Sequence, residues 1–286
     1  MRFVMICSLT LFACHAEDAE CGKWIAARDE VVSPTRTQLS DLGASGALGE
    51  QALIHDGDAV FFIGNSFFGW GDRPLPQWVT ALGMVQQPPI RIETGSDILF
   101  GNTQLAAFLR HEATQQALAS RRYKVFVLQA EEFEPVDHKA EFHQAVRDFH
   151  NAITAAGAKT ALFMTWDFRF RPFLDELSRS YEEIGAELKI PVIPVGLVYK
   201  DYRCQPFQHH TGHWLTADAQ HPHGGVHQNA MGTAVNTYAT FQLLTGIDPL
   251  GSNFQAPGNS NDDASMEYFS AMAWKRVRPR LPNSVK

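Results

Sequence analysis

The stretch AVFFIGNSFFGWG, residues 59–71, decides the fold. Its first five residues are apolar, and the run stops abruptly at Gly64-Asn65-Ser66. A short apolar run that ends at a turn is typical of a strand buried on both faces, as in a parallel sheet. Chemistry in open α/β sheets lies just beyond the carboxyl ends of the strands, so Ser66 occupies a position where a nucleophile is expected. The alternative is a strand-to-helix turn in which Ser66 only caps backbone amides.

Strand-like and helix-like segments alternate along the rest of the chain. Strands are predicted at residues 59–63, 90–93, 125–128, 160–164 and 190–195, and helices at residues 75–82, 103–120, 138–156, 172–188, 229–245 and 264–277. This alternation predicts βαβ units and a parallel sheet, and therefore an α/β fold in one domain, a three-layer α/β/α sandwich. The carboxyl ends of parallel strands meet at one edge, which places Ser66, Gly95, Gln129 and Trp166 in a shared cleft.

The composition is that of a globular protein with an acidic balance. The chain has 286 residues, of which 45% are hydrophobic and 19% charged, and its formal net charge is -7. This is enough apolar material for a sizeable core. The negative charge argues against nucleic acid and anionic membrane surfaces as partners. No stretch of the sequence is long and apolar enough for a transmembrane helix.

The N-terminus has the pattern of an export signal. Arg2 precedes the apolar segment FVMICSLTLFA, and small and acidic residues follow it, as in a secretory signal. We therefore expect a signal peptide or lipoprotein signal over residues 1–20, a connector over residues 21–55 and the α/β/α domain over residues 56–286. The protein would then be exported, either periplasmic or extracellular. The segment that ends at Cys14 also resembles a bacterial lipoprotein box, which predicts a lipid anchor on Cys14.

Two cysteines, Cys21 and Cys204, remain after removal of such a signal. An exported chain can oxidise a pair of this kind to a disulfide, and two free thiols are the alternative. No CxxC spacing in the sequence indicates a structural zinc site.

The second informative stretch is HHTGHWLTADAQHPHGGVHQN, residues 209–229. Asp218 and His221 form a D-x-x-H pair in it, and a serine nucleophile needs a histidine base whose tautomer is fixed by a carboxylate. The competing interpretation is a metal such as zinc bound by the histidines, although no metalloprotease helix with its glutamate is present. The remaining histidines are expected to be loop residues, namely His209, His210, His213, His223 and His227.

Several blocks of the chain, in the expected order, resemble the SGNH (GDSL-like) hydrolases. The sequence Ile63-Gly64-Asn65-Ser66 is similar to the first block of that family, and Asp218-Ala219-Gln220-His221-Pro222 is similar to its last block, D-x-x-H-P. Further similarity lies at residues 127–129, 163–166 and 243–249, so the resemblance covers residues 60–249. It implies a flavodoxin-like SGNH hydrolase fold and hydrolysis of ester bonds by a Ser-His-Asp triad, with neither cofactor nor metal.

The resemblance also assigns roles by position. It makes Ser66 the nucleophile, His221 the base and Asp218 the partner of that base. The oxyanion hole of the family would use the amides of Ser66 and Gly95, with Gln129 in place of an asparagine.

The substrate implied by the resemblance is a small-molecule or carbohydrate ester, because exported members of the family often deacetylate polysaccharides. Phe67, Trp70 and Trp166 are candidates for an aromatic binding floor, and core packing is the alternative for them. Two other functions stay open at this point. One is an O-acyltransferase of the same fold, and the other is a non-enzymatic exported protein that binds a metal or ligand through its histidines.

Overall fold

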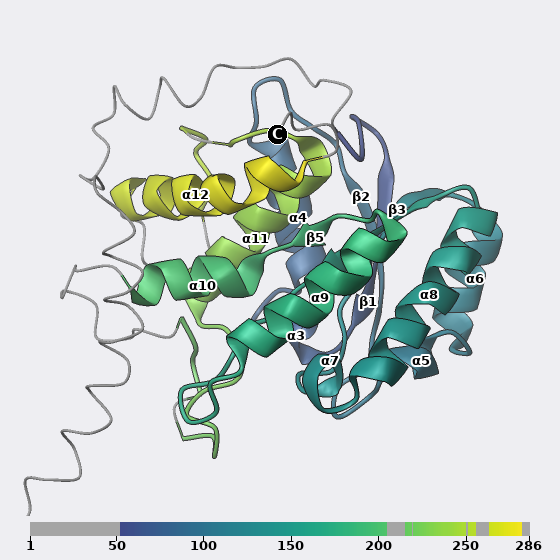
Figure 1. Cartoon of the computed structure of the whole chain (residues 1–286). Coiled ribbons are helices and arrows are strands. Elements are labelled where there is room, and N and C mark those ends of the chain that lie inside the picture. Colours follow the sequence, from purple (N-terminus) through teal and green to yellow (C-terminus); the bar gives the residue numbers. More distant parts are fainter. Residues whose placement is uncertain (1–51, 205–214, 219, 250, 256–262, 282–286) are drawn as a thin grey trace, which may run out of the picture.

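The computed structural model describes residues 52–204, 215–218, 220–249, 251–255 and 263–281 (Figure 1). The predicted signal, most of the predicted connector, Cys14 and Cys21 therefore lie outside the described residues, as do His209, His210 and His213. Within the described ranges, no helix is long and apolar enough to cross a membrane.

A parallel sheet of five strands forms the centre of the molecule, as predicted. Its order is β2-β1-β3-β4-β5, and the strands are β1 (Ala59–Gly64), β2 (Glu93–Ile98), β3 (Tyr123–Leu128), β4 (Lys159–Phe163) and β5 (Val192–Ile193). All six residues of β1 are buried, because β1 lies between β2 and β3 and both of its faces are covered. β5 is an edge strand, which agrees with the prolines that flank it.

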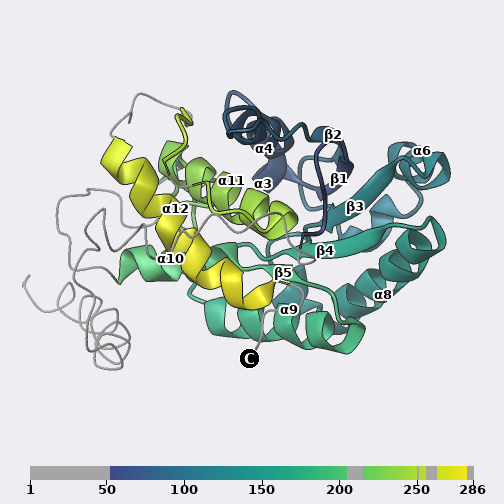
Figure 2. The ribbon, with the colours of Figure 1, turned by 90° about the horizontal axis from the view of Figure 1, so that it is seen from above.

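Helices cover both faces of this sheet and make the predicted three layers (Figure 2). One face carries α6, α8 and α9, whereas α4 and α11 pack against each other on the opposite face, with α12 outside α11. The helices are α3 (Ser66–Gly69), α4 (Leu75–Met84), α5 (Leu105–Phe108), α6 (Glu112–Ser120), α7 (Glu134–Asp137), α8 (Lys139–Ala155), α9 (Leu174–Leu188), α10 (Val195–Arg203), α11 (Ala230–Thr245) and α12 (Asp263–Val277), and a 3-10 turn, η1, follows at Arg278–Arg280.

Two predicted elements differ from the observed ones. The strand predicted at residues 90–93 instead begins at Glu93, because the backbone amide of Arg91 donates to Asp56 Oδ1 at 2.7 Å rather than to a neighbouring strand. The helix predicted at residues 103–120 is divided into α5 and α6. The second of these begins after His111, whose Nδ1 lies 2.8 Å from Oδ2 of the buried Asp97.

The core supports a direct test through Phe62 of β1, whose side chain is fully buried and meets Phe68 edge to face. We expect Phe62→Ala to lower the free energy of unfolding by about 3–5 kcal/mol, because it removes buried apolar surface and leaves a cavity. Met84→Ala is the control, since that side chain is 51% exposed and should change stability by less than about 0.5 kcal/mol. Urea unfolding of both variants measures the difference, and equal effects would contradict the burial of β1.

Candidate active site

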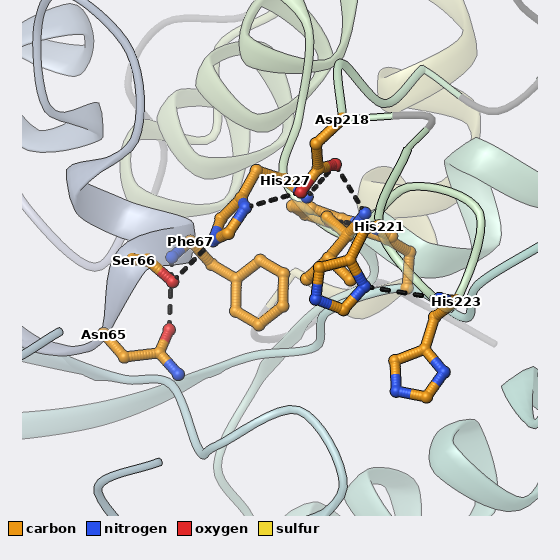
Figure 3. A network of polar contacts seen from close by, with 9 residues as sticks. Asn65, Ser66, Phe67, Asp218, His221, His223 and His227 are labelled. Atoms are coloured by element: carbon orange, nitrogen blue, oxygen red, sulfur yellow. Dashed lines mark hydrogen bonds and ion pairs between the residues drawn. The ribbon is translucent and has the colours of Figure 1, made fainter. Parts of the chain in front are cut away.

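Ser66 lies directly after β1, at the carboxyl end of the sheet, as the sequence predicts. It is the first residue of the short helix α3. Asn65 caps this helix, because its Oδ1 accepts a hydrogen bond from the amide of Phe67 at 3.1 Å (Figure 3). The amide of Trp70 donates to the Ser66 carbonyl at 2.7 Å and closes the turn. The nucleophile candidate is therefore held by its own backbone, and its hydroxyl is left to side-chain partners.

Gln129, which follows β3, supports this turn from below. Its buried Oε1 accepts a hydrogen bond from the Asn65 amide at 2.8 Å, and its Nε2 donates to the carbonyl of Ala130. A Cβ atom at Gly64 would lie 2.4 Å from Gln129 Oε1, so the close approach requires glycine there. Both ends of the Gln129 amide are engaged with backbone groups. The predicted role of Gln129 as an oxyanion donor is thus replaced by a role in fixing the Asn65-Ser66 turn.

Gly95, the other predicted oxyanion donor, does not lie beside Ser66. It lies inside β2 in register with Phe61, whereas Ile98 is the residue of β2 that pairs with Gly64 at the end of β1. A Cβ atom at Gly95 would lie 2.3 Å from the hydroxyl of Tyr123, so the glycine makes room for that side chain. The oxyanion role predicted for Gly95 is wrong because β2 extends further along the chain than its apolar pattern indicates.

The histidine-rich stretch forms a hairpin in its described part. Thr216 pairs antiparallel with Gln228, the amide of Ala217 donates to the His227 carbonyl at 2.9 Å, and the amide of Asn229 donates to the Leu215 carbonyl at 2.9 Å. This pairing sets Asp218 opposite the segment that leads into His227, at the same end of the hairpin.

Glycine allows the two arms of the hairpin to approach each other. Gly225 has a φ of +114°, and a Cβ atom there would lie 2.3 Å from Thr216 Oγ1. Few other residues adopt this backbone conformation, and none fits the available space. The hairpin therefore depends on Gly225 for the proximity of its arms.

His227 bridges Ser66 and Asp218 (Figure 3). Its Nε2 lies 2.9 Å from Ser66 Oγ, and its Nδ1 lies 2.9 Å from Asp218 Oδ2. With Nδ1–H donated to the carboxylate, Nε2 can accept the serine proton, which is the arrangement of a Ser-His-Asp triad. The structure thus brings together two of the three predicted triad residues, Ser66 and Asp218, and completes the chain of contacts with a histidine that the sequence did not single out.

Asp218 is held as a carboxylate by several donors. Burial acts to raise the pKa of Asp218, but hydrogen bonds from the Val226 amide, the His227 side chain and the His227 amide outweigh it, so the pKa lies below its ordinary value. The two amides donate to Oδ1 at 2.6 Å and 3.0 Å, which leaves Oδ2 for the imidazole. The ionised carboxylate therefore both ties the hairpin together and orients His227.

His221, the predicted base, does not contact Ser66. It lies in the turn at the tip of the hairpin, where its amide donates to the Asp218 carbonyl at 2.8 Å and its Nδ1 accepts from the His223 amide at 3.3 Å. Its ring points toward His223, at a centroid distance of 5.2 Å (Figure 3). The D-x-x-H spacing misled because the chain turns between Asp218 and Val226. Gly224-Gly225 was the available signal for a turn, since paired glycines favour one, whereas the observed pairing of Thr216 with Gln228 is what sets His227 across from Asp218.

The predicted aromatic floor is largely core. Phe67 and Trp166 are fully buried and meet edge to face at 4.9 Å, and Trp166 Nε1 donates to the Val226 carbonyl at 2.9 Å. Both side chains therefore support the hairpin from beneath, and core packing, the alternative to the predicted substrate contact, holds for them. Trp70 is different, because it is 37% exposed and stacks on the imidazole of His227.

Two other predictions concern metals and cysteines. Among the described residues, no group of three or more His, Cys, Asp and Glu side chains is placed to hold a metal ion.

Cys204 takes part in a disulfide, so it is not a free thiol, and its partner lies outside the described residues.

Acidic residues follow β3 in the loop next to Gln129. Glu131 Oε2 accepts hydrogen bonds from the amides of Phe133 and Glu134 at 2.9 Å, and this fixes the loop as a turn. Burial and the neighbouring Glu131 charge raise the pKa of Glu132 to about 7. The loop thus contains a carboxyl group that changes its charge near neutral pH.

Comparison with known proteins agrees with the observed architecture. No protein-family model and no curated protein sequence matches the chain. Among solved structures, it is similar to a protein from Slackia heliotrinireducens assigned as an SGNH hydrolase, with 18% identity, a TM-score of 0.50 and coverage of 65% of this chain and 97% of the other.

Two further solved structures are similar at comparable levels. A DUF4886 family protein from Bacteroides uniformis has 13% identity and a TM-score of 0.54, with 79% of this chain and 98% of the other covered. Axe2, an acetylxylan esterase from Geobacillus stearothermophilus, has 13% identity and a TM-score of 0.53, with 68% and 97% covered. At these identities the likeness is one of fold, and the chain has an SGNH hydrolase-like fold, as predicted.

The raised pKa of Glu132 predicts a pH dependence of stability. Its folded-state pKa of about 7 exceeds the ordinary 4.5, so the folded protein binds the proton more tightly than the unfolded chain. Stability should therefore fall as the pH rises through this interval and level off above it. Glu132→Gln should remove the contribution of Glu132 to this change of stability with pH. Melting temperatures between about pH 5 and about pH 8 measure the pH dependence of stability. Glu141→Gln is the control, because Glu141 is exposed on α8. Parallel curves for wild type and Glu132→Gln would contradict the prediction.

Proposed function

We propose that this protein is a serine hydrolase that cleaves ester bonds with Ser66 as nucleophile, His227 as general base and Asp218 as the orienting carboxylate. The observation that carries the proposal is the unbroken series of contacts from Asp218 Oδ2 through both ring nitrogens of His227 to Ser66 Oγ, each 2.9 Å long. One side chain from the end of β1 and two from the hairpin meet in the geometry that activates a hydroxyl for acyl transfer.

The reaction would proceed in two steps. Ser66 Oγ attacks the acyl carbon while its proton passes to His227 Nε2, and Asp218 stabilises the imidazolium that forms. The imidazolium then gives its proton to the departing alcohol, and an acyl-serine remains. Water attacks the acyl-serine with His227 again as base, which releases the acid and restores Ser66. The Ser66 amide, the first of α3, lies outside the internal hydrogen bonds of the helix and is the donor proposed for the oxyanion.

We propose small acyl esters of carbohydrates as the substrate class. An exposed aromatic side chain adjoins the nucleophile helix. It is Phe100, whose ring would lie 2.9 Å from a Cβ atom at Gly69. Flat aromatic surfaces of this kind suit the apolar faces of sugar rings and of acyl groups. The acetylxylan esterase with a similar fold is consistent with this class.

We also propose that the protein is exported. The disulfide at Cys204 supports this, because disulfides persist mainly in oxidising compartments. The apolar segment near the N-terminus supports it independently of the structure.

The assignment of the base is tested by two matched histidine variants. We expect His227→Ala and Ser66→Ala each to lower kcat on a short-chain ester by at least about a thousandfold, because members of a triad act as one unit. His221→Ala removes a histidine only six positions earlier on the same hairpin, and it should stay within about twofold of wild type. Hydrolysis of p-nitrophenyl acetate gives the rates, and circular dichroism checks the fold of each variant.

Labelling with a fluorophosphonate probe, read by intact mass, supplies a second measurement. Wild type and His221→Ala should form one adduct, and Ser66→Ala should form none. Loss of labelling in His221→Ala together with full labelling in His227→Ala would show that the base is misassigned. Absence of any adduct on folded wild-type protein would overturn the proposed serine chemistry.

A further inference from the structure

The imidazole of His227 lies flat against the indole of Trp70. The two ring centroids are 3.9 Å apart and the ring planes differ by only 11°. The other aromatic neighbour, Phe67, is farther away at 6.0 Å and is tilted by 40°. Trp70 is thus the aromatic group that covers a face of the imidazole, whereas the two edge nitrogens point at Asp218 and Ser66.

The indole and the nucleophile belong to one turn of backbone. The Trp70 amide donates to the Ser66 carbonyl at 2.7 Å, so these residues lie one above the other on the same side of α3. His227 arrives from the distant hairpin, and its amide is fixed there by Asp218 Oδ1. The stack is therefore a direct side-chain link between the hairpin that carries the base and the turn that carries the nucleophile.

A base that serves two partners needs a fixed ring plane. Rotation of the imidazole about its terminal side-chain bond is only weakly restricted by intrinsic preference. Tilting the ring would move Nε2 away from Ser66 Oγ and Nδ1 away from Asp218 Oδ2, and both distances are 2.9 Å. Contact with a flat indole at van der Waals distance opposes that tilt. It does so without a hydrogen bond that would compete for either nitrogen.

We propose that Trp70 is a positioning residue that holds the imidazole plane of His227 in the orientation required for proton transfer from Ser66. The inference rests on the proposed function. In it, the positioning role takes the place of the substrate-binding role that the sequence predicts for Trp70. The indole exchanges no proton and forms no bond in the reaction. Its face also attracts the imidazolium formed during attack, and α3 itself contributes no charged side chain.

The test compares three variants of the full chain. Trp70→Leu keeps apolar bulk but removes the flat ring, and we expect kcat to fall about tenfold with KM nearly unchanged, since misplacement of a catalytic group slows the chemical step. Trp70→Phe restores a flat face and should recover most of the rate. Phe170→Leu is the control, because Phe170 is 65% exposed and packs on Gly224 of the same hairpin but is not stacked on His227. Its kcat should match wild type.

A spectroscopic measurement in the Ser66→Ala background reports the stack without any turnover. A ring stacked on indole shows its imidazole carbon-bound protons shifted upfield, so the His227 signals should be upfield in Ser66→Ala. With Trp70→Phe added, the His227 ring protons should keep part of this upfield shift. With Trp70→Leu added, their chemical shifts should return toward those of free histidine.

The outcomes separate the two proposals. If wild type hydrolyses esters and Trp70→Leu does so at the same kcat, or if Phe170→Leu loses as much rate as Trp70→Leu, the positioning role is wrong while the serine mechanism stands. The same conclusion follows if the His227 signals do not respond to Trp70→Leu. If folded wild-type protein neither hydrolyses esters nor reacts with the fluorophosphonate, the proposed function fails, and the positioning role fails with it.

Discussion

The burial of β1 at the centre of the sheet is the constraint on which the rest of the structure depends. Its six residues are covered on both faces, which fixes where the strand ends and therefore where Ser66 begins α3. The end of the strand is in turn set by the close approach of Gly64 to Gln129, whose Oε1 accepts the Asn65 amide. An unpaired buried amide costs about 1–3 kcal/mol. The position of Ser66 is thus a consequence of packing and backbone pairing in the strands beneath it.

A single carboxylate, that of Asp218, connects His227 to this frame. Asp218 accepts two backbone amides through Oδ1 and the His227 ring through Oδ2, so the same charge closes the hairpin and orients the imidazole. Beneath the hairpin, Trp166 donates to the Val226 carbonyl, and Gln228 Nε2 donates to the Phe67 carbonyl of α3 at 3.0 Å. Buried hydrogen bonds therefore hold the hairpin that carries His227 against α3, which carries Ser66, across 161 residues of sequence. The Trp70 stack adds a contact between the same two segments at the solvent-exposed side.

The errors in the predicted site share one physical cause, which is that residue spacing does not fix which groups face each other. The family resemblance and the end of an apolar run at Glu93 put Gly95 at the edge of the sheet, but β2 continues through polar residues as far as Ile98 because its ladder partner is the buried β1. His221 was paired with Asp218 by its spacing, but an antiparallel hairpin brings residues together across its arms and not along one turn. Gln129 was correctly placed beside the serine turn, and only its hydrogen-bond partners were wrong.

By itself, the sequence determined the layered α/β architecture and the carboxyl-edge position of Ser66, and it singled out Asp218, whose carboxylate contacts His227. These follow from local signals, namely apolar runs of strand length, helical periodicity and turn residues, each of which acts within a few residues. Only the tertiary structure decided that His227 is the histidine between Ser66 and Asp218, that Phe67 and Trp166 are buried, and that Trp70 covers the imidazole. The Gly224-Gly225 pair indicates a turn, but these outcomes depend on how the hairpin folds back onto α3, which is long-range packing that no local pattern encodes.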